Sequence, residues 1–140
     1  MSSEAEFTYV LQGDLRILVT DDDPIMREFA SVYLSTPTVN VETADCGEAG
    51  LARLRSQHFD LALVDLDMPG ISGFEMLEHI RANPRLRDLP VVIVTSNEDM
   101  ASIDRAYALG ATSFVTKPVN WRLLAYQLRF VLRAQRALAA

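Results

Sequence analysis

The sequence predicts an α/β fold, a doubly wound parallel sheet of five strands with five helices. Short apolar runs alternate five times with segments of helical periodicity, and the connections between them are short. The run at residues 61–64 is apolar at every position, which is typical of a strand buried on both faces of a sheet. A chain of 140 residues fits one domain.

The first strand and helix are marked by their ends. Residues 16–20 form an apolar run that stops at three aspartates. Pro24 stands at a suitable first helical position with Asp23 as the N-cap. Large apolar side chains then recur at helical spacing as far as residue 37: Ile25, Phe29, Val32 and Tyr33.

The remaining elements follow the same alternation. Further strands are predicted at residues 39–43, 61–64, 90–94 and 113–116. Further helices are predicted at residues 47–57, 74–81, 98–109 and 119–137. Gly110 is the expected C-cap of the fourth helix. Residues 1–14 show no sustained periodicity, so we expect an N-terminal tail before a domain at 15–137.

Composition excludes several classes of site. A single cysteine, Cys46, rules out an internal disulfide and a multi-cysteine zinc site, and two histidines argue against a histidine-rich metal site. The first residues lack the basic start and apolar run of a secretory signal, and every apolar run is far shorter than a membrane span. We therefore expect a cytoplasmic protein.

The charges are unevenly distributed. Thirteen basic and nineteen acidic side chains give a net charge of −6, which argues against direct nucleic-acid binding through a basic surface. Residues 105–140 nevertheless carry six basic side chains and no acidic one, as expected of a solvated helix face near a helix C-terminus. Lys117 is the only lysine in the chain; all other basic side chains are arginines.

Chemically active side chains stand at the predicted strand ends. Asp21 and Asp22 follow the first strand, Asp65 the third, Thr95 the fourth and Lys117 the fifth. Ligands of such sheets bind beyond the carboxyl ends of the strands. Carboxylates brought together there repel one another and need a proton or a cation, and Mg²⁺ prefers oxygen ligands of this kind.

This set of residue types suits phosphoryl transfer. Catalysis of that reaction consists mostly of positioning and charge neutralisation, and a carboxylate can accept the group as an aspartyl phosphate. Each residue alone has an ordinary explanation, such as a helix start, a turn or a surface lysine. Their occurrence in this order at four strand ends favours a common site.

Four segments of the chain carry the motifs of a known family. They are ILVTDDD at residues 17–23, LVDLDMPGISG at 63–73, VTS at 94–96 and VTKP at 115–118. Over about residues 15–137 the chain resembles a response-regulator receiver domain of two-component signalling. The resemblance implies the flavodoxin-like strand order 2-1-3-4-5, a Mg²⁺ cofactor, and a sensor histidine kinase or phosphotransfer protein as partner.

The resemblance also implies roles for the acidic residues. Asp65 would accept the phosphoryl group, so the domain would catalyse its own phosphorylation and dephosphorylation without being a conventional enzyme. Asp22 and Asp65 would bind Mg²⁺ directly, Asp21 would act through water, and Asp67 would offer its backbone carbonyl.

The later motifs imply a switch. Thr95 would be the switch hydroxyl, Lys117 would bind the phosphoryl group, and Pro118 would follow a cis peptide bond. On phosphorylation Thr95 would move toward the phosphoryl group and Phe114 would turn inward. The surface formed by residues 98–109, 113–116 and 119–137 would change and control an output domain or partner.

The last helix suggests a further role. Its side chains Leu124, Leu128, Val131, Gln135 and Leu138 follow the 4-3 step of a coiled coil. The region resembles receivers fused to C-terminal output domains of the cyclic-diguanylate or sensor-kinase type, so residues 119–137 could continue as a connector. The stripe also predicts that activation promotes a homodimer through the fourth and fifth helices.

Two other functions fit parts of the pattern. Asp65 and Asp67 after an apolar strand imitate the aspartate pair of haloacid-dehalogenase-like phosphatases, but the acidic pair comes first in this chain and Pro69 replaces the usual residue. A pseudo-receiver would bind a partner without phosphorylation. Such domains usually lose a key residue, whereas this chain keeps all of them.

Overall fold

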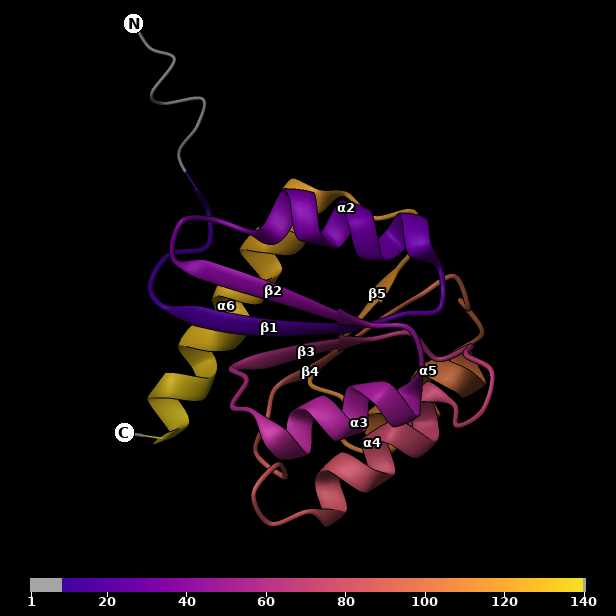
Figure 1. Ribbon diagram of the computed structural model, residues 1–140. Coiled ribbons are helices and arrows are strands. Elements are labelled where there is room, and N and C mark those ends of the chain that lie inside the picture. Colours follow the sequence, from indigo (N-terminus) through magenta and orange to yellow (C-terminus); the bar gives the residue numbers. More distant parts are fainter. Residues whose placement is uncertain (1–8, 140) are drawn as a thin grey trace, which may run out of the picture.

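The computed structural model describes residues 9–139 and shows a single sheet covered by helices on both faces (Figure 1). All strand pairs are parallel, in the order β2-β1-β3-β4-β5. The strands are β1 (Leu15–Thr20), β2 (Val39–Ala44), β3 (Leu61–Val64), β4 (Val91–Thr95) and β5 (Ser113–Thr116). The predicted fold class and strand order are confirmed.

Five helices connect or follow the strands within the described residues. They are α2 (Pro24–Leu34), α3 (Gly47–Ser56), α4 (Gly73–Ala82), α5 (Met100–Ala108) and α6 (Trp121–Ala139). None of them is both long and apolar enough to cross a membrane.

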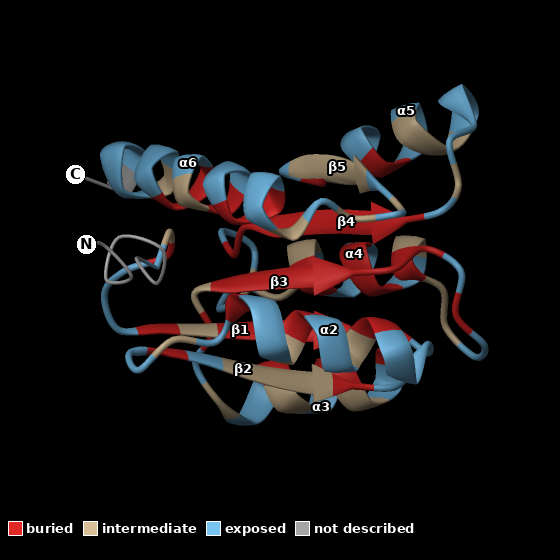
Figure 2. Ribbon diagram, turned by 90° about the horizontal axis from the view of Figure 1, so that it is seen from above, coloured by how far each residue is buried: buried red, intermediate tan, exposed pale blue. Residues whose placement is uncertain are grey.

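The sheet separates two apolar cores. One core joins α2 and α6 to side chains such as Ile17 and Leu63, and the other joins α3, α4 and α5 to side chains such as Leu18 and Ile93. β3 and β4 are buried along their whole length, as Figure 2 shows in red. Burial on both faces explains why these strands are apolar without alternation.

Capping side chains set several helix ends. Asp23 accepts a hydrogen bond from the Ile25 N–H at 2.9 Å and starts α2 with proline at the first position, as predicted. Ser72 caps α4 in the same way through the Glu75 N–H.

The C-terminus of α5 closes on a glycine. Gly110 has a φ of +105°, its N–H bonds to Tyr107, and the Ala111 N–H bonds to Ala106. This double pattern is a Schellman motif, which favours glycine because that residue adopts positive φ without steric cost.

Many predicted boundaries differ from the structure by one to three residues, and the differences at β4, α5 and α6 illustrate this. β4 runs one residue further and includes Thr95. The next helix starts at Met100 rather than at residue 98, because Asp99 caps it by accepting from the Ala101 N–H. The last helix starts at Trp121 rather than at residue 119, because the side-chain Oδ1 of Asn120 accepts a hydrogen bond from the Leu123 N–H and caps the helix.

The N-terminal segment is more than a tail. Leu11 is buried in the core beneath α2 and α6, and Val10 packs against the same core. The prediction of a tail at 1–14 is therefore wrong for these two residues, and residues 1–8 of that prediction lie outside the described part. Two apolar side chains with no periodicity around them give no signal that distinguishes core from tail.

Candidate functional site

The strand register places the predicted site residues at one edge of the sheet. Thr20 pairs with Val64, so Asp21 and Asp65 leave neighbouring strands at the same level. Their backbones are held there by hydrogen bonds from the Asp21 N–H to Ala44 and from the Asp65 N–H to Thr20. The sheet itself therefore fixes the positions of the two carboxylates.

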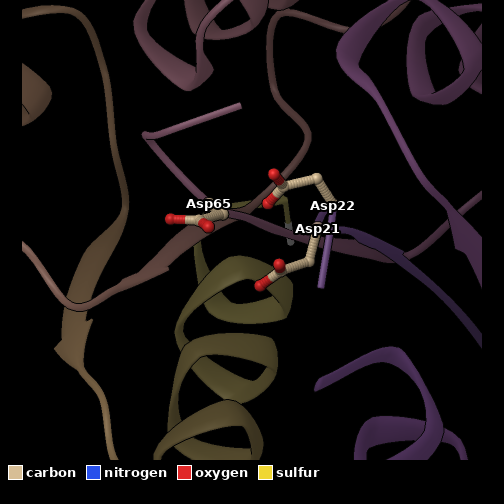
Figure 3. A group of neighbouring side chains, drawn as sticks. All are labelled: Asp21, Asp22 and Asp65. Carbon is tan, nitrogen blue, oxygen red and sulfur yellow. The ribbon is translucent and has the colours of Figure 1, made fainter. Parts of the chain in front are cut away.

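Three carboxylates converge at this edge (Figure 3). One oxygen from each of Asp21, Asp22 and Asp65 lies within 4.8 Å of the other two. Asp21 and Asp65 are buried, at 2% and 6% exposure, whereas Asp22 is exposed. The site is therefore partly buried, and solvent and ligands can enter it on the side of Asp22.

Lys117 bridges two of these carboxylates. The end of β5 pairs with the end of β4, and the Lys117 N–H bonds to the Thr95 carbonyl at 2.8 Å. From there Nζ lies 2.8 Å from Asp21 Oδ2 and 3.3 Å from Asp65 Oδ2. The only lysine of the chain is therefore 20% exposed and paired with two acids.

Burial and charge shift two pKa values at the site. Burial raises the pKa of the Asp21 carboxyl above its usual range, although the hydrogen bonds from Lys117 and the Asp23 N–H oppose this. Burial lowers the pKa of Lys117, but the hydrogen bond to Asp21 and the charges of Asp65 and Asp21 outweigh it and raise that pKa. Lys117 is therefore firmly cationic.

The donor set fits a hard divalent cation. When all four groups are ionised, three carboxylates and one ammonium leave a net charge of −2. Every donor in the acidic cluster is an oxygen, which suits Mg²⁺, and the exposed side of Asp22 leaves room for the waters that this ion retains. Sulfur and imidazole ligands, which would favour zinc, do not belong to this cluster.

The other predicted residues surround the carboxylates. Thr95 is fully buried, and its hydroxyl accepts a long 3.4 Å hydrogen bond from the Asn97 N–H. The Lys117–Pro118 peptide bond is cis. Phe114 is partly buried and packs against the core beneath α3, α4 and α5. Asp67 is exposed, and its N–H lies 3.4 Å from Asp65 Oδ1.

Two contacts seen only in the structure also shape the site. Arg27 on α2 donates to the backbone carbonyl of Asp21 at 2.9 Å. Glu48 on α3 accepts from the Ile71 N–H at 3.1 Å and so ties down the loop that follows Asp65. Local sequence contains no signal for either contact, because each depends on the packing of helices beside the strand ends.

A large hollow among the described residues lies elsewhere. It has a volume of about 620 Å³ and is lined by residues such as Phe59 and Pro90, near the amino ends of β3 and β4. Parallel-sheet ligands bind at the carboxyl ends instead, where the carboxylates converge. We therefore place the functional site at the acidic cluster and not in the larger hollow.

Known proteins resemble this chain in sequence and in fold. The family model described as "Response regulator receiver domain" matches residues 17–129. The chain belongs to the response regulator receiver domain family. It is accordingly a receiver domain of two-component signalling and not a member of a conventional enzyme family, and the phosphatase alternative is not favoured.

Individual relatives show how far the similarity extends. The heme response regulator HssR of Staphylococcus aureus is 33% identical over 119 residues, which cover 85% of this chain and 52% of HssR. The chain therefore spans about half the length of this curated relative. The chemotaxis response regulator CheY4 of Vibrio cholerae has a TM-score of 0.79 at 28% identity, over 85% of this chain and 99% of CheY4.

One solved neighbour carries a ligand. The response regulator TrrA of Thermotoga maritima was solved in complex with Mg²⁺ and BeF, and it is 32% identical with a TM-score of 0.74. The match covers 84% of this chain and 98% of that one.

Proposed function

We propose that Asp65 accepts a phosphoryl group from a histidine kinase or phosphotransfer protein with the help of Mg²⁺. The observation that carries the proposal is the buried Asp65 carboxylate, with Lys117 Nζ at 3.3 Å and two further carboxylates beside it. We also propose that the domain and its kinase meet in the cytoplasm.

The acceptor reaction is a simple displacement. An oxygen of the Asp65 carboxylate attacks phosphorus, the bond from phosphorus to the donor breaks, and the donor leaves with that electron pair. Bound Mg²⁺, held by Asp22, Asp65 and the Asp67 carbonyl with Asp21 acting through water, would neutralise charge on the phosphoryl oxygens. Lys117 supplies a second positive charge 3.3 Å from the acceptor.

The switch rests on Thr95 and Phe114. Among the described residues, the Thr95 hydroxyl makes only the long contact with the Asn97 N–H, so a phosphoryl oxygen on Asp65 offers it a stronger partner. Phe114 stands two residues before Thr116, which pairs with Thr95, and it is only partly buried. Movement of Thr95 would let Phe114 turn inward and alter the surface of α5, β5 and α6.

Phosphorylation of Asp65 can be tested directly. The protein is incubated with acetyl phosphate and Mg²⁺, and the intact mass is measured before and after. We expect a gain of one phosphoryl group that is absent in Asp65→Asn and absent with EDTA. An unchanged mass in the parent protein, with Mg²⁺ binding intact, contradicts the proposal.

Asp67→Asn is the matched control. It removes a neighbouring carboxylate but keeps the backbone carbonyl proposed to face the metal, so the receiver proposal expects phosphorylation to persist. A phosphatase of the haloacid-dehalogenase type would instead hydrolyse a phosphate ester and lose that turnover at Asp67. The same variant therefore distinguishes the two functions.

The output is proposed to run through α5, β5 and α6. These outer elements lie together along one edge of the sheet (Figure 2). Their exposed large apolar side chains include Met100, Tyr107, Leu123, Tyr126 and Phe130. A C-terminal output domain is proposed because the match covers only about half of HssR. The exposed side chains support a homodimer on activation.

Sedimentation tests this output. The solution mass is measured in Mg²⁺ with and without beryllofluoride as a phosphoryl mimic. We expect a monomer that becomes a dimer, and we expect Phe130→Glu to remain a monomer. An unchanged mass, with mimic binding confirmed by NMR, would contradict self-association and point to docking on a different protein.

A further inference from the structure

Each of the four polar atoms of Asp21 takes part in a hydrogen bond. Its N–H donates to Ala44, and its carboxylate accepts from the Asp23 N–H at 2.9 Å and from Lys117 Nζ at 2.8 Å. Its backbone carbonyl accepts from Arg27 Nη1 at 2.9 Å. Of these four partners, only Arg27 is a long side chain reaching back from a helix.

Arg27 joins both ends of the turn between β1 and α2. Its backbone N–H bonds to the Asp23 carbonyl at 3.1 Å, which is the first hydrogen bond of the helix. Its guanidinium folds back to the Asp21 carbonyl, at the last position before that turn. Arg27 is partly buried, so the contact is sheltered from full competition by water.

We infer that Arg27 is a positioning residue, which holds the Asp21 carboxylate in the orientation that Mg²⁺ binding requires. The inference rests on the proposed function. A backbone rotation that displaced the Asp21 Cα would carry its carboxylate away from Lys117 and from the acidic cluster. A hydrogen bond from a charged donor to the Asp21 carbonyl opposes this rotation.

The effect is geometric and not one of charge alone. The charged groups that shift the pKa of Asp21 are Lys117 and Asp65, and Arg27 is not among them. Arg27 touches the backbone of Asp21 and not its carboxylate. Outer partners that orient metal ligands typically contribute tenfold or more to metal affinity, so we expect an effect of about tenfold.

The test compares Arg27→Met with Arg27→Lys. Methionine keeps length and apolar packing but removes the donor, whereas lysine keeps a charged donor. Mg²⁺ affinity is measured by calorimetry without any phosphodonor, at two salt concentrations. We expect about tenfold weaker binding for Arg27→Met, partial recovery for Arg27→Lys, and a ratio to the parent that salt does not change.

Two further comparisons separate positioning from general loosening of the fold. Arg55→Met removes an exposed arginine from α3 and should leave Mg²⁺ affinity unchanged. In an Asp21→Asn background the Arg27→Met effect should vanish, because there is no longer a carboxylate to orient. Urea unfolding of each variant shows whether it remains folded under the conditions of the titration.

The outcomes distinguish this inference from the proposed function. If the parent binds Mg²⁺ and is phosphorylated while Arg27→Met binds equally well, the positioning role is overturned and the receiver function stands. An Arg27→Met loss that persists in the Asp21→Asn background also overturns it. A parent protein that neither binds Mg²⁺ nor gains a phosphoryl group overturns both.

Discussion

Asp21 shows at the scale of one residue how function opposes stability. Its carboxylate is 2% exposed, and burial raises its pKa above the model-compound range. A raised pKa in the folded state means that the fold favours the protonated acid over the carboxylate. The stabilisation is complete below the unfolded pKa of 3.8 and is lost as pH rises through the folded pKa.

Asp21→Asn should therefore stabilise the metal-free protein at neutral pH. Asparagine resembles the protonated acid and removes one of three neighbouring negative charges. We expect a higher free energy of unfolding than in the parent at pH 7, in EDTA, and a difference that shrinks toward zero as pH falls below 3.8. Urea titrations at both pH values measure it, and a variant less stable than the parent at pH 7 contradicts the prediction.

The buried hydroxyl of Thr20 also lowers the stability of the fold. Its hydroxyl is buried against α3 and has no hydrogen-bond partner within the described part of the chain. Sequence analysis attaches no consequence to threonine at this position, because an unpaired hydroxyl is visible only in the packed structure. A buried polar group without a partner destabilises a fold.

Thr20→Val should stabilise the protein, by up to about 1 kcal/mol, because it removes the unpaired hydroxyl at nearly constant volume.

Gly50→Ala, on the helix that covers Thr20, should destabilise the protein. A Cβ at residue 50 would lie 2.5 Å from Thr20 Oγ1 and 2.8 Å from the Met76 methyl group, so we expect a loss of about 1–3 kcal/mol. Thermal unfolding of both variants, each compared with the parent, checks the opposite signs.

Among the elements, α6 packs most of its apolar stripe against the sheet and not against a second helix. Leu124, Leu128 and Val131 are buried against the sheet, so this part of the stripe belongs to the core and is unavailable to a partner helix. Gln135 donates to the Asp88 carbonyl at 2.7 Å. Leu138, at the end of the stripe, is 85% exposed, and other exposed apolar side chains such as Leu123 and Phe130 lie off the stripe.

Two single substitutions on α6 should therefore differ strongly. Leu128 is fully buried, and Leu128→Ala should cost about 2–5 kcal/mol of unfolding free energy. Phe130 is 72% exposed, and Phe130→Ala should change stability by less than about 0.5 kcal/mol. Chemical denaturation of both variants measures this, and equal losses would show that the stripe is not the buried face.

Five strands, and the convergence of Asp21, Asp65 and Lys117, were predictable because chain order and strand polarity dictate which ends meet. The surface against which the apolar stripe of α6 packs was not predictable, because a 4-3 spacing suits packing on a sheet as well as on a second helix.

Long-range side-chain contacts were equally hidden from the sequence. Arg81 on α4 donates to the carbonyls of Gly110, Arg87 and Leu89, and so joins three chain segments. Burial lowers the pKa of Arg81, although Asp88 partly opposes this. Acceptors up to 29 residues away leave no local pattern, so only the packed structure identifies the contact.

At the scale of the whole molecule, the acidic cluster makes stability depend on cations. Three converging carboxylates oppose compaction unless their charge is neutralised, and Lys117 compensates only one of them. A ligand that binds only the folded state stabilises it by mass action.

Mg²⁺ should therefore raise the unfolding temperature of the intact protein. At a concentration about one hundred times the dissociation constant, the gain corresponds to about 2.7 kcal/mol. Calorimetry in MgCl₂ and in NaCl of equal ionic strength measures it, with Asp22→Asn as the variant expected to gain much less. Equal stabilisation by both salts would indicate general screening instead of a bound ion.

The single lysine has a consequence for the chemistry of the whole surface. The only side-chain amine is protonated, mostly covered and engaged by Asp21 and Asp65. Every other cationic side chain is an arginine, which ordinary acylating reagents leave untouched at neutral pH. Apart from the N-terminal amine, Lys117 is therefore the one position where an acylating reagent can form a stable amide. The rate of that reaction reports whether Asp21 and Asp65 still hold the amine.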